Sequence, residues 1–169
     1  MYALLVTGPP GAGKSTTLEA LSDRLYDEDV RHASLDSDAV CWAHPPLSSA
    51  MQLRHLQAIC RLYRDEGYDL LLVSAPVSTA VERDALLAAV GVDDYFLVRL
   101  AAPEATLRRR IVEREPPGWS QLQNLIRRSS DMSAAMDALP GVHLTIDTEQ
   151  ASPAEVAAEI LAACGRLST

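Results

Sequence analysis

Lysine is nearly missing from this 169-residue chain, since fourteen of its 15 basic residues are arginine and the only lysine is Lys14. A bias in composition explains why lysine is rare. It does not explain why the single lysine lies within a glycine-rich stretch close to the N-terminus. The position therefore indicates that this stretch requires a lysine.

Cysteine and long apolar runs are also scarce. The three cysteines, Cys41, Cys60 and Cys164, are odd in number and lack metal-ligand spacing, so they support neither a disulfide framework nor a zinc site. We expect buried free thiols. No run approaches the roughly 20 apolar residues that span a bilayer, and no basic segment precedes an apolar core at the N-terminus. We therefore expect a cytoplasmic protein with no membrane partner.

Positive charge is in the minority, because the formal net charge is -8. General nucleic-acid binders gain most of their affinity from cationic surface, so nucleic acid is an improbable partner. The arginines nevertheless cluster at 108–110, 114 and 127–128. This clustering suggests a small anionic ligand, with solvated helix faces as the alternative.

The length and the pattern of apolar residues predict one α/β domain over residues 1–169. Short apolar runs that alternate with helical periodicities are typical of a parallel sheet covered on both faces. The predicted strands are 2–7, 30–35, 69–75, 95–101 and 142–147. The predicted helices follow Lys14, cover 47–63 and 79–90, begin at 103, cover 119–139 and begin at 152.

Residues 8–15, GPPGAGKS, match the phosphate-binding pattern G-x-x-x-x-G-K-[ST] between a predicted strand and a predicted helix. Glycines allow successive backbone amides to turn toward phosphate oxygens, and the helix start adds unpaired amides. The alternative is a glycine-rich turn without a ligand, which would not need the lysine. The expected nucleotide contacts are Gly8, Gly11, Ala12, Gly13, Lys14 at the β and γ phosphates, Ser15 at Mg²⁺, and Thr16 at the α phosphate.

With this loop and this order of elements, the chain resembles the small P-loop kinases, a group that includes shikimate, gluconate and adenylylsulfate kinases and related antibiotic phosphotransferases. The resemblance implies a P-loop NTPase fold with a five-stranded parallel sheet in the order 2-3-1-4-5 and a short lid. It also implies ATP and Mg²⁺ as cofactors and a small-molecule hydroxyl as the acceptor.

The segment LDSDAV, 35–40, looks like the paired-carboxylate segment of those kinases. By this resemblance, Asp36 faces the water shell of Mg²⁺, and Asp38 is the base that orients the acceptor hydroxyl. The alternative is that Asp36 or Ser37 caps the following helix. The strand at 69–75 ends in serine and alanine, whereas the corresponding strand of motor ATPases usually ends in an acidic residue. This absence disfavours a motor or switch ATPase. It leaves Asp36 to contact the water molecules around the metal, as in the small kinases.

The segment LRRRIVEREPPGW, 107–119, resembles the arginine-bearing helix that enters the lid of these kinases. The resemblance assigns Arg110 to the adenine face and Arg114, one helical turn later, to the phosphates. Pro116, Pro117 and Gly118 interrupt the helix where a lid hinge would lie.

Two further assignments come from the resemblance, and a third comes from position along the chain. Asp147 lies in IDTEQASP, the loop that borders the adenine, and Arg83 begins the substrate-side helix unless it is a surface arginine. Trp42 and His44 follow the acidic pair as candidate acceptor contacts. A core tryptophan and a surface histidine are the alternative.

The sequence is compatible with several functions. The leading hypothesis is an ATP-dependent small-molecule kinase, followed by a nucleoside or nucleotide kinase, with a polynucleotide end kinase disfavoured by the acidic surface. A regulatory module that only binds ATP is the alternative from another class. Such a module has no use for two carboxylates beside the γ phosphate and would show no acceptor-dependent turnover.

Overall fold

The computed structural model describes residues 1–40 and 43–165. In chain order the elements of this part are β1 (Tyr2–Thr7), α1 (Lys14–Asp27), β2 (Ala33–Asp36), α2 (Ser37–Val40), α3 (Ser49–Asp65), β3 (Leu70–Ser74), α4 (Ala80–Val90), β4 (Asp94–Ala101), α5 (Glu104–Arg114), α6 (Leu122–Met136), β5 (Leu144–Asp147) and α7 (Pro153–Cys164).

The five strands form one parallel sheet in the order β2-β3-β1-β4-β5. This confirms the expected α/β fold and strand order. Because β1 is central, the loop that follows it opens at the middle of the sheet edge where all the strands end. Ligands of open parallel sheets bind at this carboxyl edge, where neighbouring strands connect to opposite faces.

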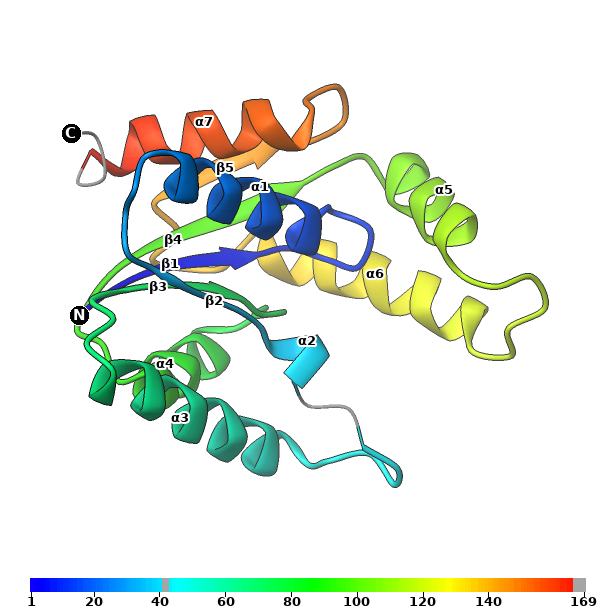
Figure 1. Cartoon of the computed structure of the whole chain (residues 1–169). Coiled ribbons are helices and arrows are strands. Elements are labelled where there is room, and N and C mark those ends of the chain that lie inside the picture. Colours follow the sequence, from blue (N-terminus) through cyan, green and yellow to red (C-terminus); the bar gives the residue numbers. More distant parts are fainter. Residues whose placement is uncertain (41–42, 166–169) are drawn as a thin grey trace.

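Two apolar cores cover the two faces of the sheet, with α3 and α4 on one face and α1 and α7 on the other (Figure 1). Successive side chains of β1 alternate between them: Ala3 and Leu5 belong to the first core, and Leu4 and Val6 to the second. This alternation explains the uninterrupted apolar sequence of the strand. A fully buried leucine contributes about 2 kcal/mol of transfer free energy, so the helices are held mainly by these contacts.

Some boundaries differ from the sequence prediction. The second strand begins at Ala33 and not at residue 30, because the chain first closes α1: the Val30 amide donates to the Leu25 carbonyl at 2.8 Å, and Asp29 adopts a positive φ of 55°. The short helix α2 was not predicted as a separate element.

The long helix predicted over 119–139 is shorter and covers Leu122–Met136. Before it, the Trp119 amide donates to the Pro116 carbonyl at 3.2 Å and the Leu122 amide to the Trp119 carbonyl at 3.1 Å, which makes turns and not a helix. After it, the Leu139 amide returns to the Met136 carbonyl at 3.2 Å. Apolar spacing continues through such turns, so periodicity alone overestimated the helix.

Other expectations concern helix starts, cysteines and membranes. The last helix starts where the sequence predicted it, with Ser152 as its cap in a capping box with Glu155. Cys60 is buried and free, Cys164 is free but half-buried, and Cys41 lies outside the described residues. In the described part of the chain, no helix is both long enough and apolar enough to cross a membrane.

Candidate active site

The loop between β1 and α1 leaves the first turn of α1 open. Gly13, the N-cap residue, is left-handed with φ 92°, and no side chain caps the helix. Gly11 has φ 86°, and a Cβ there would lie 2.8 Å from the Leu107 carbonyl oxygen of α5, so a larger residue cannot be accommodated. Uncapped amides and the positive end of the helix dipole favour an anion at this position.

Lys14 lies within this loop. Its Nζ donates to the Gly8 carbonyl at 2.9 Å and to the Pro9 carbonyl at 3.4 Å. Burial lowers the pKa of Lys14, while the charges of Asp38 and Asp36 raise that pKa and two arginines lower it further. The lysine ammonium group is therefore close enough to both predicted carboxylates for their charges to interact.

Asp36 contacts the phosphate loop and also caps a helix. Its Oδ2 accepts from the Ser15 hydroxyl at 2.6 Å, and its Oδ1 accepts from the Asp38 amide at 3.0 Å. The capping alternative is therefore observed, and the same carboxylate also contacts the serine that the sequence predicts at the metal. The cap also fixes the chain direction that places Asp38 on the cleft wall.

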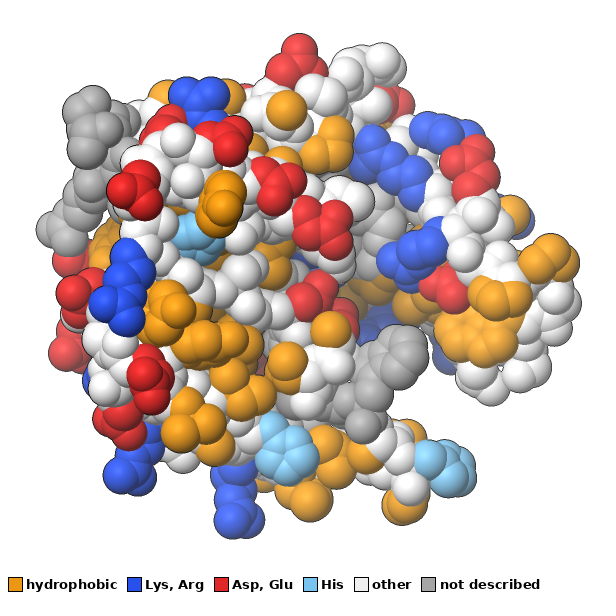
Figure 2. Space-filling view, in the orientation of Figure 1, with side chains coloured by type: hydrophobic (Ala, Val, Ile, Leu, Met, Phe, Trp, Pro, Cys, Tyr) orange, Lys and Arg blue, Asp and Glu red, His pale blue; other side chains and the backbone are white. Residues whose placement is uncertain are grey.

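A cleft of about 1150 Å³ opens along the carboxyl edge of the sheet. Its wall includes the phosphate loop, both carboxylates, the ends of α5 and α6, and the β5–α7 loop. Figure 2 shows the molecule hollowed between its main body and the part formed by α5 and α6, with basic side chains gathered over α5. The volume exceeds that of a typical single-ligand pocket, which suits a nucleotide with a second molecule beside it.

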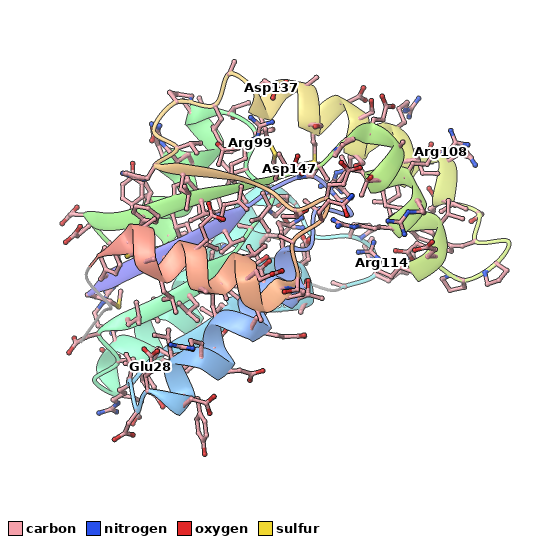
Figure 3. The ribbon with its side chains drawn as sticks, turned by 90° about the horizontal axis from the view of Figure 1, so that it is seen from above. Glu28, Arg99, Arg108, Arg114, Asp137 and Asp147 are labelled. Carbon is pink, nitrogen blue, oxygen red and sulfur yellow. The ribbon has the colours of Figure 1, made fainter. Side chains whose placement is uncertain are left out.

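The two arginines predicted from α5 both line the cleft. Arg110 donates to the Thr148 carbonyl at 2.6 Å, to the Thr148 hydroxyl at 3.0 Å and to the Gly11 carbonyl at 3.3 Å, so it joins the phosphate loop to the β5–α7 loop. Arg114 pairs with Glu115 at 2.5 Å. Figure 3 shows Arg114 at the end of α5 beside the cleft and Arg108 pointing away from the molecule.

Three other predicted residues, Thr16, Asp147 and Arg83, make hydrogen bonds within the chain. Thr16 is exposed, and its hydroxyl donates to the Gly13 carbonyl at 2.9 Å. Asp147 accepts from the Glu149 amide at 2.9 Å, and Arg83 donates to the Pro140 carbonyl and to Asp84. Neither Asp147 nor Arg83 is among the described residues that line the cleft. Trp42 lies outside the described residues.

Three residues that line or support the cleft had no individual role in the sequence prediction, although Arg128 belonged to the arginine cluster that suggested an anionic ligand. Arg128 of α6 lines the wall and is one of the charges that lower the pKa of Lys14. Ser129 is buried and donates to the Pro10 carbonyl at 2.7 Å. The hydroxyl of the buried Thr148 lies 3.2 Å from the Ala12 carbonyl and 3.2 Å from the Ala101 carbonyl and shares its proton between them. The signal for Ser129 was its polarity at an apolar position of the helical pattern.

The oxygen atoms of Ser15 and Asp36 suit Mg²⁺ that is bound together with a nucleotide, and they do not make a site in which the protein alone holds a metal. No cluster of three His, Cys, Asp or Glu side chains that could hold a metal occurs in the part of the chain that the structure describes. Mg²⁺ commonly uses one or two protein oxygens together with substrate phosphates and waters. The bonded pair of Ser15 and Asp36 beside the phosphate loop has this composition.

The parallel sheet with this loop defines a P-loop NTPase fold, and hence a nucleotide-binding protein. The family model described as AAA domain (AAA_18) matches residues 4–131. The chain belongs to this family of P-loop domains. No curated protein matches the chain in sequence.

Solved structures with a similar fold include several small-molecule kinases. A sugar kinase from Janibacter sp. HTCC2649 superposes with a TM-score of 0.70 at 19% identity, covering 100% of this chain and 99% of the other. A gluconokinase from Sinorhizobium meliloti 1021 gives 0.69 at 22% identity, covering 98% and 92%. An APS kinase from Mycobacterium tuberculosis, solved in complex with AMPPNP and APS, gives 0.67 at 18% identity, covering 97% of each chain.

Proposed function

We propose that this protein is an ATP- and Mg²⁺-dependent kinase that transfers the γ-phosphoryl group to a hydroxyl of a small-molecule acceptor. One observation supports this most strongly: Asp36 is bonded to the phosphate-loop serine, and Asp38 follows it on the wall of the same cleft. A protein that only binds a nucleotide needs the loop but not a second carboxylate facing it. The similarity in fold to sugar and gluconate kinases is consistent with this chemistry.

The nucleotide phosphates would lie on the open amides of the loop. There Lys14 would exchange its contacts with the Gly8 and Pro9 carbonyls for the β and γ phosphates. Ser15 and Asp36 would hold Mg²⁺ directly and through water, and the ion would neutralise phosphate charge. The adenine would lie beside Arg110 and the β5–α7 loop.

In the transfer step, an acceptor oxygen forms a bond to the γ phosphorus while the bond from that phosphorus to the β–γ bridging oxygen breaks. The acceptor hydroxyl proton passes to the Asp38 carboxylate, and ADP leaves with the bridging oxygen. Lys14, Arg114 and Arg128 are close enough for their charges to interact, and all three line the cleft. Because such transfer depends mainly on positioning and charge neutralisation, their role would be to orient the γ phosphate and to stabilise its charge.

The test is ADP formation from ATP and Mg²⁺ with a panel of hydroxylated metabolites: sugars, sugar acids, nucleosides and hydroxylated antibiotics. We expect slow hydrolysis alone and a large stimulation by one acceptor class, with a phosphorylated product detected by mass spectrometry. Tight ATP binding with no stimulation by any panel member would contradict the proposal and favour a nucleotide-binding regulatory module.

A further inference from the structure

Ser74, the last residue of β3, has a fully buried hydroxyl with no hydrogen-bond partner in the described part of the chain. A buried hydroxyl without a hydrogen bond is unfavourable, because it has lost its bonds to water and gained none in return. Buried polar groups in proteins nearly always have partners. Among the described buried side-chain nitrogen and oxygen atoms, only Arg99 Nε shares this condition. The contacts within the folded chain therefore do not explain why a serine occupies this position.

The register of the sheet places Ser74 beside the candidate metal site. Ser74 lies opposite Asp36 on β2 and opposite Val6 on β1. Side chains of paired residues in a parallel sheet point to the same face, and adjacent strands are about 4.8 Å apart. Val6 packs in the core with Leu18 of α1. Ser74 and Asp36 are therefore direct neighbours on the face of the sheet that α1 covers. They lie at the N-terminal end of α1, where Ser15 donates to Asp36.

The chemistry of the two neighbours is complementary. Both Asp36 oxygens already accept one hydrogen bond, from Ser15 and from the Asp38 amide, but a carboxylate can accept about four. A hydroxyl can donate one hydrogen bond and accept others, so it can bridge a carboxylate and a water molecule. Residues that orient metal ligands through such bonds commonly change metal affinity when they are mutated.

We propose that Ser74 is a positioning residue for Mg²⁺ bound with the nucleotide: its hydroxyl bridges the Asp36 carboxylate and the water layer of the ion. This inference rests on the proposed function for the presence of the metal, and it adds a third strand end to the site. The competing explanation is packing alone, in which serine is present only because it is small enough to lie beneath α1.

The experiment measures Mn²⁺ binding to the ADP complex by electron paramagnetic resonance, with ADP affinity in EDTA measured separately by calorimetry. Ser74→Ala should weaken Mn²⁺ binding about 10-fold and leave metal-free ADP affinity unchanged. Its melting temperature without ligand should equal or exceed that of wild type, because no existing hydrogen bond is lost. Ser74→Thr retains a hydroxyl and should bind Mn²⁺ within a few-fold of wild type.

Ser34→Ala is the matched control, since Ser34 lies on β2 opposite Leu72, on the same face but exposed and two residues before Asp36. It should change none of these quantities. Wild-type Mn²⁺ affinity in Ser74→Ala, an equal loss of metal-free ADP affinity, or a melting temperature several degrees lower would each overturn the inference. No acceptor is present, so a protein that shows the Ser74 effect but phosphorylates nothing would contradict the proposed function alone.

Discussion

Lys14 has opposite energetic effects in the free protein and in the proposed nucleotide complex. Burial lowers its pKa, so the folded chain holds this proton less tightly than the unfolded chain does. The charged lysine therefore destabilises the free fold at pH values below the folded pKa. That cost fades as the pH rises from the folded pKa toward the unfolded pKa. Bound phosphates would favour the charged form and remove the cost.

We predict that Lys14→Ala lowers acceptor-dependent turnover at saturating ATP by about 10²-fold or more, because one group that stabilises transferred charge is removed. The melting temperature at pH 7 without nucleotide should equal or exceed that of wild type. Steady-state kinetics and calorimetry measure both. Turnover within a few-fold of wild type in a fully folded variant would show that Lys14 does not act on the phosphates.

The two carboxylates should separate into different roles when each is changed. Asp38→Asn should lower turnover by about 10²-fold or more with little change in ATP affinity, since a base acts only in the transfer step. Asp36→Asn should in addition shift the Mg²⁺ concentration required for half-maximal activity, because Asp36 holds Ser15. Turnover as a function of Mg²⁺ concentration distinguishes them. If Asp38→Asn lowers only the melting temperature, its role is structural.

Some residues of the site can be predicted from a local sequence pattern, and others cannot. The phosphate loop and the pair Asp36 and Asp38 are contiguous segments with a recognisable chemical pattern, so the sequence alone predicted them. Ser74, Ser129 and Thr148 act through hydrogen-bonding positions that exist only once distant strands and helices come together. Nothing in their local sequence indicates which carbonyl or carboxylate they will face.

At the scale of elements, α6 and the β5–α7 loop support the phosphate loop from behind. Ser129 donates to the Pro10 carbonyl at 2.7 Å, and the Thr148 hydroxyl lies 3.2 Å from the Ala12 carbonyl, at the same distance as from Ala101 of β4. Arg110 adds a contact from α5 to the Gly11 carbonyl at 3.3 Å. Three elements thus hold carbonyls on the outer side of the loop, which keeps its inner side available for a ligand.

We predict that Ser129→Ala destabilises the protein by about 1 kcal/mol, the value of one buried hydrogen bond. It should also weaken ATP binding several-fold. Without the bond to Pro10 the phosphate loop is less ordered before ATP binds, so part of the binding free energy is used to order it. Ser133→Ala, one turn further along α6 and half-buried, is the control. Denaturant titration and calorimetry measure the two effects. Equal behaviour of both variants would mean that the contact with Pro10 does not organise the loop.

The elements themselves were predictable where burial alone decides them. All five strands were found as short apolar runs. The sequence of β1 is apolar throughout because it is buried on both faces, whereas the edge strands β2 and β5 carry exposed residues beside the buried ones. The errors occur where backbone hydrogen bonds end an element. Asp29 turns the chain at positive φ before β2, and turns flank α6 at both ends. Apolar periodicity contains no information about such turns.

Over the whole molecule, charge is distributed unevenly. The net charge is -8, yet Lys14, Arg110, Arg114 and Arg128 all line the cleft. Asp36, Asp38 and Glu115 also line the cleft, so its cations are concentrated beside carboxylates, an arrangement that suits a small anion bound with a metal ion. The overall negative charge repels a polyanion such as nucleic acid. This distribution supports a nucleotide and a small acceptor as ligands more than a nucleic-acid end.

The connection between α5 and α6, residues 115–121, is the segment best suited to act as a lid. Its two stems are anchored, since Arg110 of α5 and Ser129 of α6 both bond to the phosphate loop. Between them Trp119 lines the cleft and is 39% exposed. Movement should therefore be confined to the connection and to the last turn of α5, which carries Arg114.

We predict that this connection closes when nucleotide and acceptor are both bound, which excludes water from the γ phosphate and suppresses hydrolysis without acceptor. Arg114 would then exchange Glu115, its partner at 2.5 Å, for phosphate. Arg114→Ala should lose about 10²-fold of the acceptor stimulation while retaining most ATP affinity, because the phosphate loop supplies the main contacts. Arg108→Ala, on the outward side of the same helix, should behave like wild type (Figure 3).

Hydrogen exchange tests the closure directly. Exchange across residues 110–120 should slow only with a non-hydrolysable ATP analogue and acceptor together. Equal exchange in every state would identify a static loop and leave Arg114 without a role in transfer.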